Sequence, residues 1–299
     1  MRNAITSILN QTHSDFELII VDDHSEIPMD GLVKSFGDSR IKYLRNETNL
    51  GPGASRNRGI DIASGDWICF LDSDDEFLPN YLNDIKGKIK LLNEKVGFLW
   101  TGILTFGKGN RLIGDGCWKP KWKESTYLTF LHNIHIGTNC GICVRRDCFE
   151  KVRFDDSLRA AEDTEFFLRL TQFYDYTFVD KNLVKVYKNS PDRVTRNYDA
   201  TYEAYKKIVK LHSEAINSNK YLKEKYFRKL FRLAYYNADK KFARKLFGKI
   251  KKRPDSIFLK LIFEILPTKL AIQIHQFIAS IQTGVNYSVK RINESANQQ

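Results

Sequence analysis

Hydrophobic positions along the first two hundred residues follow two patterns. Short apolar runs of strand length predict buried strands. These runs are ELIIVDD (17–23), IKYL (41–44), WICFL (67–71) and VGFLWTGILTF (96–106). Apolar residues at helical spacing predict helices over residues 2–11, 54–63, 80–93, 125–131 and 160–173. Strands that alternate with helices in this way are typical of α/β proteins.

The stretch NLGPGASRNRGIDIASGDWICFLDSDD (49–75) predicts a turn, a helix, a second turn, a buried strand and a cluster of acids. Asn49 can cap the helix, while Gly51 and Gly53 let the backbone approach a ligand at the helix N-terminus. Gly65 is expected to end the helix. In open α/β sheets, ligands bind at the carboxyl ends of strands, which is where these acids lie.

Three carboxylates follow this strand within a few residues: Asp72, Asp74 and Asp75. Such charges repel one another unless a cation lies among them, and Mg²⁺ or Mn²⁺ takes one or two carboxylates together with phosphate oxygens. The spacing places Asp72 and Asp74 on one side of an extended backbone, so that one ion can meet both. The alternative is a solvated acidic turn that opens the next helix. Because the acids follow an apolar strand and a glycine-bearing turn, we favour the metal site.

Three segments resemble the family 2 glycosyltransferases: SILNQTHSDFELIIVDDHS (7–25), the stretch at 49–75, and AEDTEFFLRL (161–170). They occur in the family's order and spacing. The resemblance implies the A-type nucleotide-sugar-binding fold, which is a Rossmann-like, mixed but mostly parallel sheet flanked by helices. It also implies an inverting, metal-dependent hexosyltransferase. Such an enzyme moves a sugar from a nucleoside diphosphate donor, expected to be UDP-linked, to a glycan or lipid-linked glycan acceptor in surface polysaccharide biosynthesis.

The resemblance assigns roles on the donor side. Asp23 matches the acid that accepts a hydrogen bond from the nucleotide base, and Asp22 lies beside it, either in direct contact or in a turn. Asp74 matches the acid that binds the cation, and Asp72 the acid that binds the ribose, or the ion through water. Arg56 either faces phosphate or is an ordinary solvated helix residue. The predicted nucleotide-sugar-binding residues are Asp22, Asp23, Asn49, Gly51, Arg56 and Asp72, and the predicted metal ligands are Asp74 and Asp72.

Inverting transfer also needs a general base that takes the proton of the acceptor hydroxyl, and a carboxylate suits that role. The family's base lies in an acidic pair, which the match places on Asp163, with Glu162 as a neighbour that contacts the acceptor. The alternative is compensation of the helix dipole by acids in the first turn. The upstream motifs favour the catalytic interpretation. We expect acceptor specificity to lie in residues 96–150.

The chain departs from the family at its start. Family members open with a central strand of the type VSVIIPTYN, whereas this chain begins at the helix that follows. The two strands expected to flank it, at 17–23 and 41–44, then cannot bond directly, because paired strands lie ~4.8 Å apart. Either Met1 is an internal start codon of a longer protein or the donor site is defective, and we favour the truncated start.

Composition limits the class of protein. The 299 residues suffice for one large domain, or for a domain with an appendage. Five cysteines without a secretory signal point to a reducing cytosol and free thiols. A zinc site built from Cys140, Cys143, Cys148, His132 and His135 is disfavoured, because positions i and i+3 of a strand point to opposite faces. No apolar run is long enough for a membrane span, so we expect a cytoplasmic protein.

The basic excess lies in the last third of the chain. Residues 201–299 contain 21 Lys/Arg and 7 Asp/Glu, whereas the whole chain contains 48 and 36. A basic tract attracts nucleic acid or the anionic face of a membrane. Without a zinc-finger, RNA-recognition or basic-zipper signature, nucleic acid is the weaker choice. Helical spacing predicts helices over 199–216, 220–236 and 239–250.

The segment SIFLKLIFEILPTKLAIQIHQFIASI (256–281) is the most apolar, and its polar residues form one narrow stripe: Ser256, Lys260, Glu264, Thr268 and Lys269. This pattern is typical of a helix that lies in a membrane interface, here kinked at Pro267. The alternative is a pair of helices that pack on the catalytic domain or on a partner subunit. The neighbouring lysines favour an anionic membrane surface, at the inner face of the plasma membrane.

The expected organisation is a catalytic domain at 1–198, a basic helical region at 199–283 and a disordered tail at 284–299. Within the first, nucleotide-sugar binding is expected in 1–95 and the acceptor side in 96–198. Two rival functions remain open. A non-catalytic relative that binds nucleotide-sugar or a partner enzyme is suggested by the absent opening strand, and a nucleic-acid-binding protein by the basic tail.

Overall fold

The computed structural model describes residues 1–137, 141–188, 197–251 and 254–275. The chain divides into two compact units, Met1–Asn197 and Tyr198–Gln299. The tail predicted at 284–299 and the last residues of the 256–281 segment lie outside the described residues.

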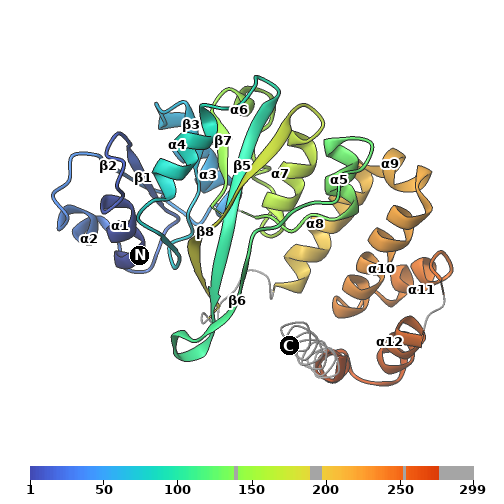
Figure 1. The fold of residues 1–299 in the computed structure, drawn as a ribbon. Helices are drawn as coiled ribbons and strands as arrows, with labels where there is room; N and C mark the ends of the chain where they lie inside the picture. The colour runs from blue at the N-terminus through green and yellow to red at the C-terminus, as the bar shows by residue number, and fades with distance from the viewer. Residues whose placement is uncertain (138–140, 189–196, 252–253, 276–299) are drawn as a thin grey trace, which may run out of the picture. The chain divides into compact units, whose positions relative to one another are not determined.

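The first unit is a sheet structure with helices packed around it (Figure 1). Most helices and strands lie where the sequence predicts them, with ends shifted by a few residues. In chain order they are α1 (Arg2–Leu9), β1 (Leu18–Asp22), α2 (Asp30–Lys34), β2 (Ile41–Arg45), α3 (Pro52–Ile62), β3 (Trp67–Cys69), β4 (Glu76–Phe77), α4 (Tyr81–Ile89), β5 (Val96–Phe106), a 3-10 turn (Lys108–Asn110), β6 (Leu112–Gly116), α5 (Thr126–His132), β7 (Cys143–Arg145), α6 (Cys148–Lys151), α7 (Glu162–Leu170) and β8 (Asp175–Tyr187).

The main sheet has the strand order β3-β7-β5-β8-β4, with β6 as a hairpin partner of β5. The sheet is mixed, as predicted. Among the described residues, β1 with β2 and β5 with β8 pair in parallel, whereas β3 with β7, β5 with β7, β4 with β8, and β5 with β6 pair antiparallel. Strand β6 follows β5 after a short turn and pairs with it antiparallel, as a hairpin connection requires.

Strands β1 and β2 form a separate two-stranded sheet. Within the described residues β3 pairs only with β7, so β1 and β3 do not bond to each other. The prediction that the strands at 17–23 and 41–44 cannot bond directly was wrong, because β1 and β2 are adjacent and pair in parallel from Leu18 with Ile41 to Asp22 with Arg45.

The long strand β5 is the centre of the hydrophobic core. Phe98, Leu99 and Trp100 are completely buried, and the rings of Phe130 and Phe167 pack 5.6 and 5.5 Å from the ring of Phe98. By contrast, β3 spans only three residues and is half-buried, which corrects the prediction of a fully buried strand over 67–71. Strand β3 is at one end of the strand order of the main sheet, and in the described part of the chain its other side pairs with no strand.

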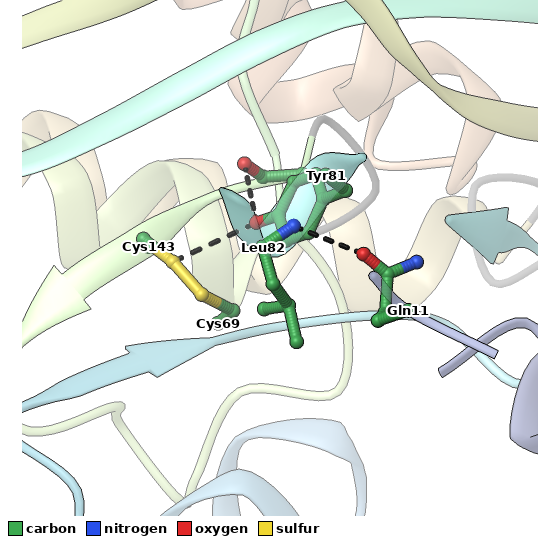
Figure 2. Close-up of a disulfide and its surroundings, with 6 residues drawn as sticks. Gln11, Cys69, Tyr81, Leu82 and Cys143 are labelled. Atoms are coloured by element: carbon green, nitrogen blue, oxygen red, sulfur yellow. Dashed lines mark hydrogen bonds between the residues drawn. A yellow bond between two sulfur atoms is a disulfide. The ribbon is translucent and has the colours of Figure 1, made fainter. Parts of the chain in front are cut away.

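A disulfide joins Cys69 on β3 to Cys143 on β7, where the two strands pair (Figure 2). The buried Tyr81 hydroxyl donates to the carbonyl of Gly141 at 3.0 Å, next to this disulfide. The expectation of free thiols is therefore corrected for this pair, whereas Cys117 and Cys148 are free. Cys140 lies outside the described residues.

Helix α3 is attached to the segment that precedes α7 by its buried Asn57. The Asn57 amide donates to the carbonyl of Phe154 at 2.9 Å and to Asp156 at 2.6 Å, and its oxygen accepts from the Phe154 amide at 3.1 Å. Arg153 adds a bond to the Asn57 carbonyl at 2.8 Å. These contacts join residues almost a hundred positions apart in sequence.

The second unit is helical in its described residues. Its helices are α8 (Tyr198–Leu211), α9 (Ser213–Ser218), α10 (Lys220–Tyr236), α11 (Lys240–Phe247) and α12 (Pro254–Ile265), followed after Pro267 by helical residues 268–275. The helix predicted over 199–216 is divided at His212, and the predicted break at Pro267 is present. Within the part of the chain that the structure describes, no helix has both the length and the apolarity that a membrane crossing needs.

Candidate functional site

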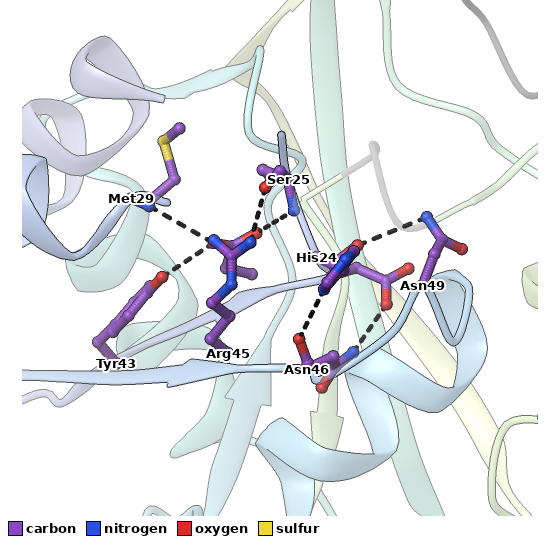
Figure 3. A network of polar contacts seen from close by, with 9 residues as sticks. His24, Ser25, Met29, Tyr43, Arg45, Asn46 and Asn49 are labelled. Carbon is purple, nitrogen blue, oxygen red and sulfur yellow. Dashed lines mark hydrogen bonds and ion pairs between the residues drawn. The ribbon is translucent and has the colours of Figure 1, made fainter. Parts of the chain in front are cut away.

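Asp22 holds together the turn that follows β1, through its bonds to Ser25, Met29, Tyr43 and Arg45, which Figure 3 labels. Its buried carboxylate accepts from the amides of Ser25 at 2.8 Å and Met29 at 3.4 Å, the hydroxyl of Tyr43 at 2.8 Å and the guanidinium of Arg45 at 2.9 Å. Burial raises the pKa of Asp22, but the hydrogen bonds outweigh it and bring the pKa to about 2. These contacts support the turn role of Asp22 over direct contact with a nucleotide.

Asp23 is the adjacent acid, and its carboxylate fixes the loop before α3. One oxygen accepts from the Asn46 side-chain amide and from the Leu50 amide, both at 2.7 Å, and the other accepts from the Gly51 amide at 2.8 Å. An ionised carboxylate has about four acceptor positions. The oxygen that meets Gly51 therefore keeps one position for an N–H group of a ligand, which is compatible with the predicted role of Asp23.

Gly51 has a left-handed backbone conformation that favours glycine, and the end of the Arg159 side chain lies against it. Its φ is 89°, and a Cβ atom would lie 2.4 Å from Arg159 Nη1. Gly51 is also the N-cap of α3, with Pro52 in the first turn, so Asn49 does not cap this helix as predicted. A proline at this position already supplies the helical φ and lacks an amide that needs a cap. The Asn49 side chain instead donates to the Asp23 carbonyl at 3.4 Å.

Arg159 is a candidate residue that the sequence analysis missed. It is exposed, and its guanidinium lies 3.4 Å from the Asn49 carbonyl, beside the loop that Asp23 fixes. Such long contacts leave it able to turn toward an anion. The available signal was a basic residue three positions before the predicted acidic pair.

His24 is a second missed candidate. It has a left-handed backbone with φ 63°, and its Nδ1 lies 3.3 Å from the Asn46 carbonyl (Figure 3). A residue other than glycine in this region stores strain, and such strain is concentrated at functional sites. His24 thus places an exposed imidazole at the carboxyl end of β1.

Arg56 on α3 is the centre of a second cluster. Its guanidinium lies 2.6 Å from Glu162 on α7 and 3.5 Å from Asp72 after β3, and it lies over the ring of Phe154 at 5.5 Å. The exposed fractions of the Arg56 and Glu162 side chains are only 17% and 8%, whereas that of Asp72 is 39%. The fold therefore brings together predicted residues from three distant segments. In this structure Arg56 contacts carboxylates, so its predicted phosphate role stays a prediction.

Asp163 stands next to this cluster, in the first turn of α7, after Ala161 with its left-handed φ of 54°. Burial and repulsion by Glu162 raise the pKa of Asp163 to about 6, against the attraction of Arg56 and the hydrogen bond from the Thr164 amide. Burial also raises the pKa of Asp72, although Arg56 opposes it. A carboxylate with this pKa is ionised at neutral pH and is a better proton acceptor than an ordinary aspartate.

The remaining acids after β3 differ in their surroundings. Asp74 is exposed and lines a cavity of about 430 Å³, together with Met1, Arg2, Asn3, Ser73, Glu76, Asn110 and Tyr187. Asp75 is buried and accepts from the Tyr187 amide at 3.0 Å, which anchors the acidic loop to the end of β8. Asp74 is thus open to a ligand, while Asp75 holds the loop in place.

The donor set around Asp74 suits a hard divalent cation that is shared with a substrate. Within the described residues no group of three or more His, Cys, Asp or Glu side chains is arranged to hold a metal ion. Mg²⁺ and Mn²⁺ at phosphate sites take only one or two protein carboxylates, with the other oxygens from phosphate and water. Asp74 and the neighbouring Asp72 meet that smaller requirement.

Sequence comparison identifies the family. Residues 1–153 match the sequence model of Glycosyl transferase family 2. The chain belongs to this family. The site described above is therefore the candidate active site of a family 2 glycosyltransferase, and the predicted fold and family are confirmed.

Several relatives of this glycosyltransferase have names that describe a reaction. A Campylobacter jejuni protein, GalNAc(5)-diNAcBac-PP-undecaprenol beta-1,3-glucosyltransferase, is 28% identical over 231 residues, which cover 74% of this chain and 72% of that protein. An Escherichia coli UDP-Glc:alpha-D-GlcNAc-diphosphoundecaprenol beta-1,3-glucosyltransferase is 36% identical over 134 residues, 45% of this chain and 51% of that protein. An uncharacterized glycosyltransferase of Methanocaldococcus jannaschii is 29% identical over 62% of this chain, which spans 64% of that protein.

The solved structures of Staphylococcus aureus TarS share the fold. The complex of TarS 1–349 with UDP-GlcNAc has a TM-score of 0.57 and 19% identity, and the likeness covers 87% of this chain and 74% of that chain. The complex with UDP has a TM-score of 0.52 and 22% identity, and covers 69% of this chain and 60% of that chain. At this identity the likeness establishes the A-type glycosyltransferase fold.

Proposed function

We propose that the enzyme is an inverting, metal-dependent transferase that moves a sugar from UDP to a lipid-linked glycan in surface polysaccharide biosynthesis. The observation that carries this proposal is the meeting of Asp72, Glu162 and Asp163 around Arg56, because it brings the predicted donor side and the predicted base into one cluster. The names of the C. jejuni and E. coli relatives, which specify diphosphoundecaprenol-linked acceptors, support the acceptor class.

On the donor side, the carboxylate of Asp23 would accept from the nucleobase. The oxygen that meets Gly51 has the remaining acceptor position, and an imide N–H such as that of uracil has the matching donor. The UDP and UDP-GlcNAc complexes of TarS, and the UDP-glucose named for the E. coli relative, support uracil as the base.

On the acceptor side, Asp163 would take the proton of the attacking hydroxyl. The hydroxyl oxygen bonds to the anomeric carbon as the bond to the diphosphate breaks, and the proton goes to the Asp163 carboxylate. Attack opposite the leaving diphosphate inverts the configuration of that carbon. A pKa of about 6 leaves Asp163 ionised at cytoplasmic pH and close to the value that favours proton transfer.

Asp74 and Asp72 would hold the divalent cation, Mn²⁺ or Mg²⁺. When bound, such an ion neutralises charge that develops on the departing diphosphate. Asp75 contributes by holding the acidic loop against β8, so that Asp74 faces the cavity.

The test is release of UDP from UDP-sugars with and without Mn²⁺, with and without a polyprenyl-diphosphate glycan. We expect Mn²⁺-dependent release that Asp74→Ala and Asp163→Asn reduce by about a hundredfold or more. The control Asp66→Ala removes an exposed acid from the turn before β3 and is expected to have normal activity. Product anomers read by NMR should be β from an α-linked donor. Full activity of Asp163→Asn, an α-linked product, or turnover unaffected by EDTA would each contradict the corresponding part of the proposal.

A further inference from the structure

Helix α12 in the second unit exposes a continuous apolar surface. Four of its large apolar side chains have exposed fractions between 38% and 75%, and they lie on one side of the helix because they are spaced one, four and eight positions apart. We call this surface the α12 outer face, and its residues are Ile257 (40%), Phe258 (38%), Leu261 (53%) and Ile265 (75%). Leu270, in the helical residues after Pro267, is also exposed.

The polar stripe of α12 faces the other helices instead of water. The hydroxyl of buried Ser256 accepts from Arg228 at 2.7 Å. Glu264 accepts from Tyr235 at 3.1 Å and from Arg244 at 2.6 Å. The Glu264 carboxylate has a pKa of about 2, because the bonds from Arg244 and Tyr235 outweigh its slight burial.

The stripe is completed by Lys260, whose ammonium lies over the ring of Phe247 at 4.7 Å. Leu259 and Phe263 are buried on the same side as the stripe. The arrangement corrects the simple expectation for an amphipathic helix, in which the polar side faces water. Because the polar groups are satisfied inside the unit, rotation of α12 to hide its outer face would break these bonds. The outer face is thus held outward by the fold.

The segment of the sequence that leads into α12 is strongly basic. Between residues 240 and 260 the sequence contains nine Lys/Arg and one acidic residue. Lys245, Lys249 and Lys251 are exposed. An apolar helix face that follows a lysine-rich segment suits the boundary between lipid headgroups and acyl chains. There the apolar side chains enter the acyl layer, and the lysines meet anionic headgroups. A protein partner that covers the same surface would need an apolar patch with a strongly acidic rim.

We propose that the α12 outer face inserts into the headgroup region of an anionic membrane, with the lysines that precede α12 on the lipid phosphates. This inference rests on the second unit alone and does not depend on the proposed reaction.

The test is sedimentation of the full chain with sucrose-loaded vesicles, made of phosphatidylcholine alone or with about a third phosphatidylglycerol. We expect binding to the anionic vesicles that weakens with salt. The triple variant F258S/L261S/I265S should lose at least about a hundredfold in partitioning, since a large apolar side chain that enters lipid is worth roughly tenfold or more. The control I27S/L91S removes two side chains of the first unit that are 75% and 81% exposed, and it should bind like the wild type.

Two charge-reversal variants test the role of the lysines. K249E/K251E should weaken binding to anionic vesicles, while K90E/K95E, with the same change in net charge on exposed residues of the first unit, should not. Circular dichroism melting checks that the variants fold, and I265S alone, with an expected loss of about tenfold, serves if the triple variant does not. Release of UDP by a soluble assay should be unchanged in the triple variant, which separates failure of docking from failure of the proposed reaction. Unchanged vesicle binding by the triple variant, no binding by the wild type, or a wild-type dimer that the triple variant makes monomeric would overturn the proposal.

Discussion

Replacing Arg56 with alanine tests the cluster at the candidate active site most directly. The change leaves Glu162, Asp72 and Asp163 without the guanidinium that lies 2.6 Å from Glu162 and 3.5 Å from Asp72. Breaking a buried ion pair by removing one partner costs about 3–5 kcal/mol, and the exposure of Asp72 places this case near the lower end. We therefore expect the free energy of unfolding to fall by about 3 kcal/mol, or roughly 6–12 °C in melting temperature for a unit of this size.

The activity of this variant should fall for a separate reason. Arg56 lowers the pKa of Asp163, against the burial and the repulsion by Glu162 that raise it. Without Arg56 the pKa of Asp163 rises further, so less of the base is ionised at neutral pH. The acidic limb of the pH profile for UDP release should consequently move to higher pH. Arg56→Lys keeps the charge but loses the planar fork, so it should show a smaller shift in the same direction.

A double-mutant cycle with Glu162→Gln decides whether Arg56 acts through Glu162. Urea unfolding of the wild type, both single variants and the double variant gives the coupling energy, which we expect to be about 2 kcal/mol, because the double variant leaves no unpaired charge at this contact. The control is Lys181→Ala, which breaks a 2.6 Å pair between Asp84 and a lysine whose side chain is 60% exposed, and it should cost no more than about 1 kcal/mol. Additive effects of the Arg56 and Glu162 changes within about 0.5 kcal/mol would refute the reasoning.

Three further predictions concern single residues. The pKa of Asp163 is raised to about 6, so the stability that the protonated carboxyl contributes is present at pH 4 and is lost as the pH rises through 6. In EDTA at pH 8, urea unfolding of Asp163→Asn should therefore give a free energy of unfolding about 1–3 kcal/mol above that of the wild type. Equal stability would contradict the raised pKa. His24→Gly removes left-handed strain and should raise stability by about 0.5–1 kcal/mol in the same assay, whereas a loss would show that the imidazole contact dominates. Arg159→Ala should weaken UDP binding about tenfold by calorimetry with unchanged melting, and unchanged affinity would remove Arg159 from the donor site.

Much of the fold was predictable from local pattern, as β5 and the start of α7 show. Strand β5 has the bounds of its apolar run, because a strand buried on both faces leaves a continuous signal. The ends of β3 were not predictable in the same way. The apolar run over 67–71 is longer than the strand, since pairing with β7 stops at Cys69. Pairing depends on a partner more than seventy residues away, and the run itself does not contain that information.

The candidate site shows the same division. The acids after β3 and at the start of α7 were recognisable as a set, because each follows a motif with fixed spacing. The ion pair between Arg56 and Glu162 could not be recognised from the sequence, since the two residues lie more than a hundred positions apart. The prediction that Asn49 caps α3 was wrong, because the helix begins two residues later, with Gly51 (φ 89°) as its N-cap and Pro52 in its first turn. Likewise, the Cys69–Cys143 pairing follows from strand register, which cysteine spacing does not reveal.

The attachment of α3 to the segment before α7 sets a limit on how such enzymes can be recombined. Asn57 uses its amide and its oxygen on residues 154 and 156, and Arg153 returns a bond to the Asn57 carbonyl. A chimera that exchanges everything beyond residue 95 to import another acceptor preference would separate these partners, although its junction looks natural in the sequence. A working chimera must therefore take α3 and the segment before α7 from the same parent, so the donor and acceptor halves cannot be exchanged separately.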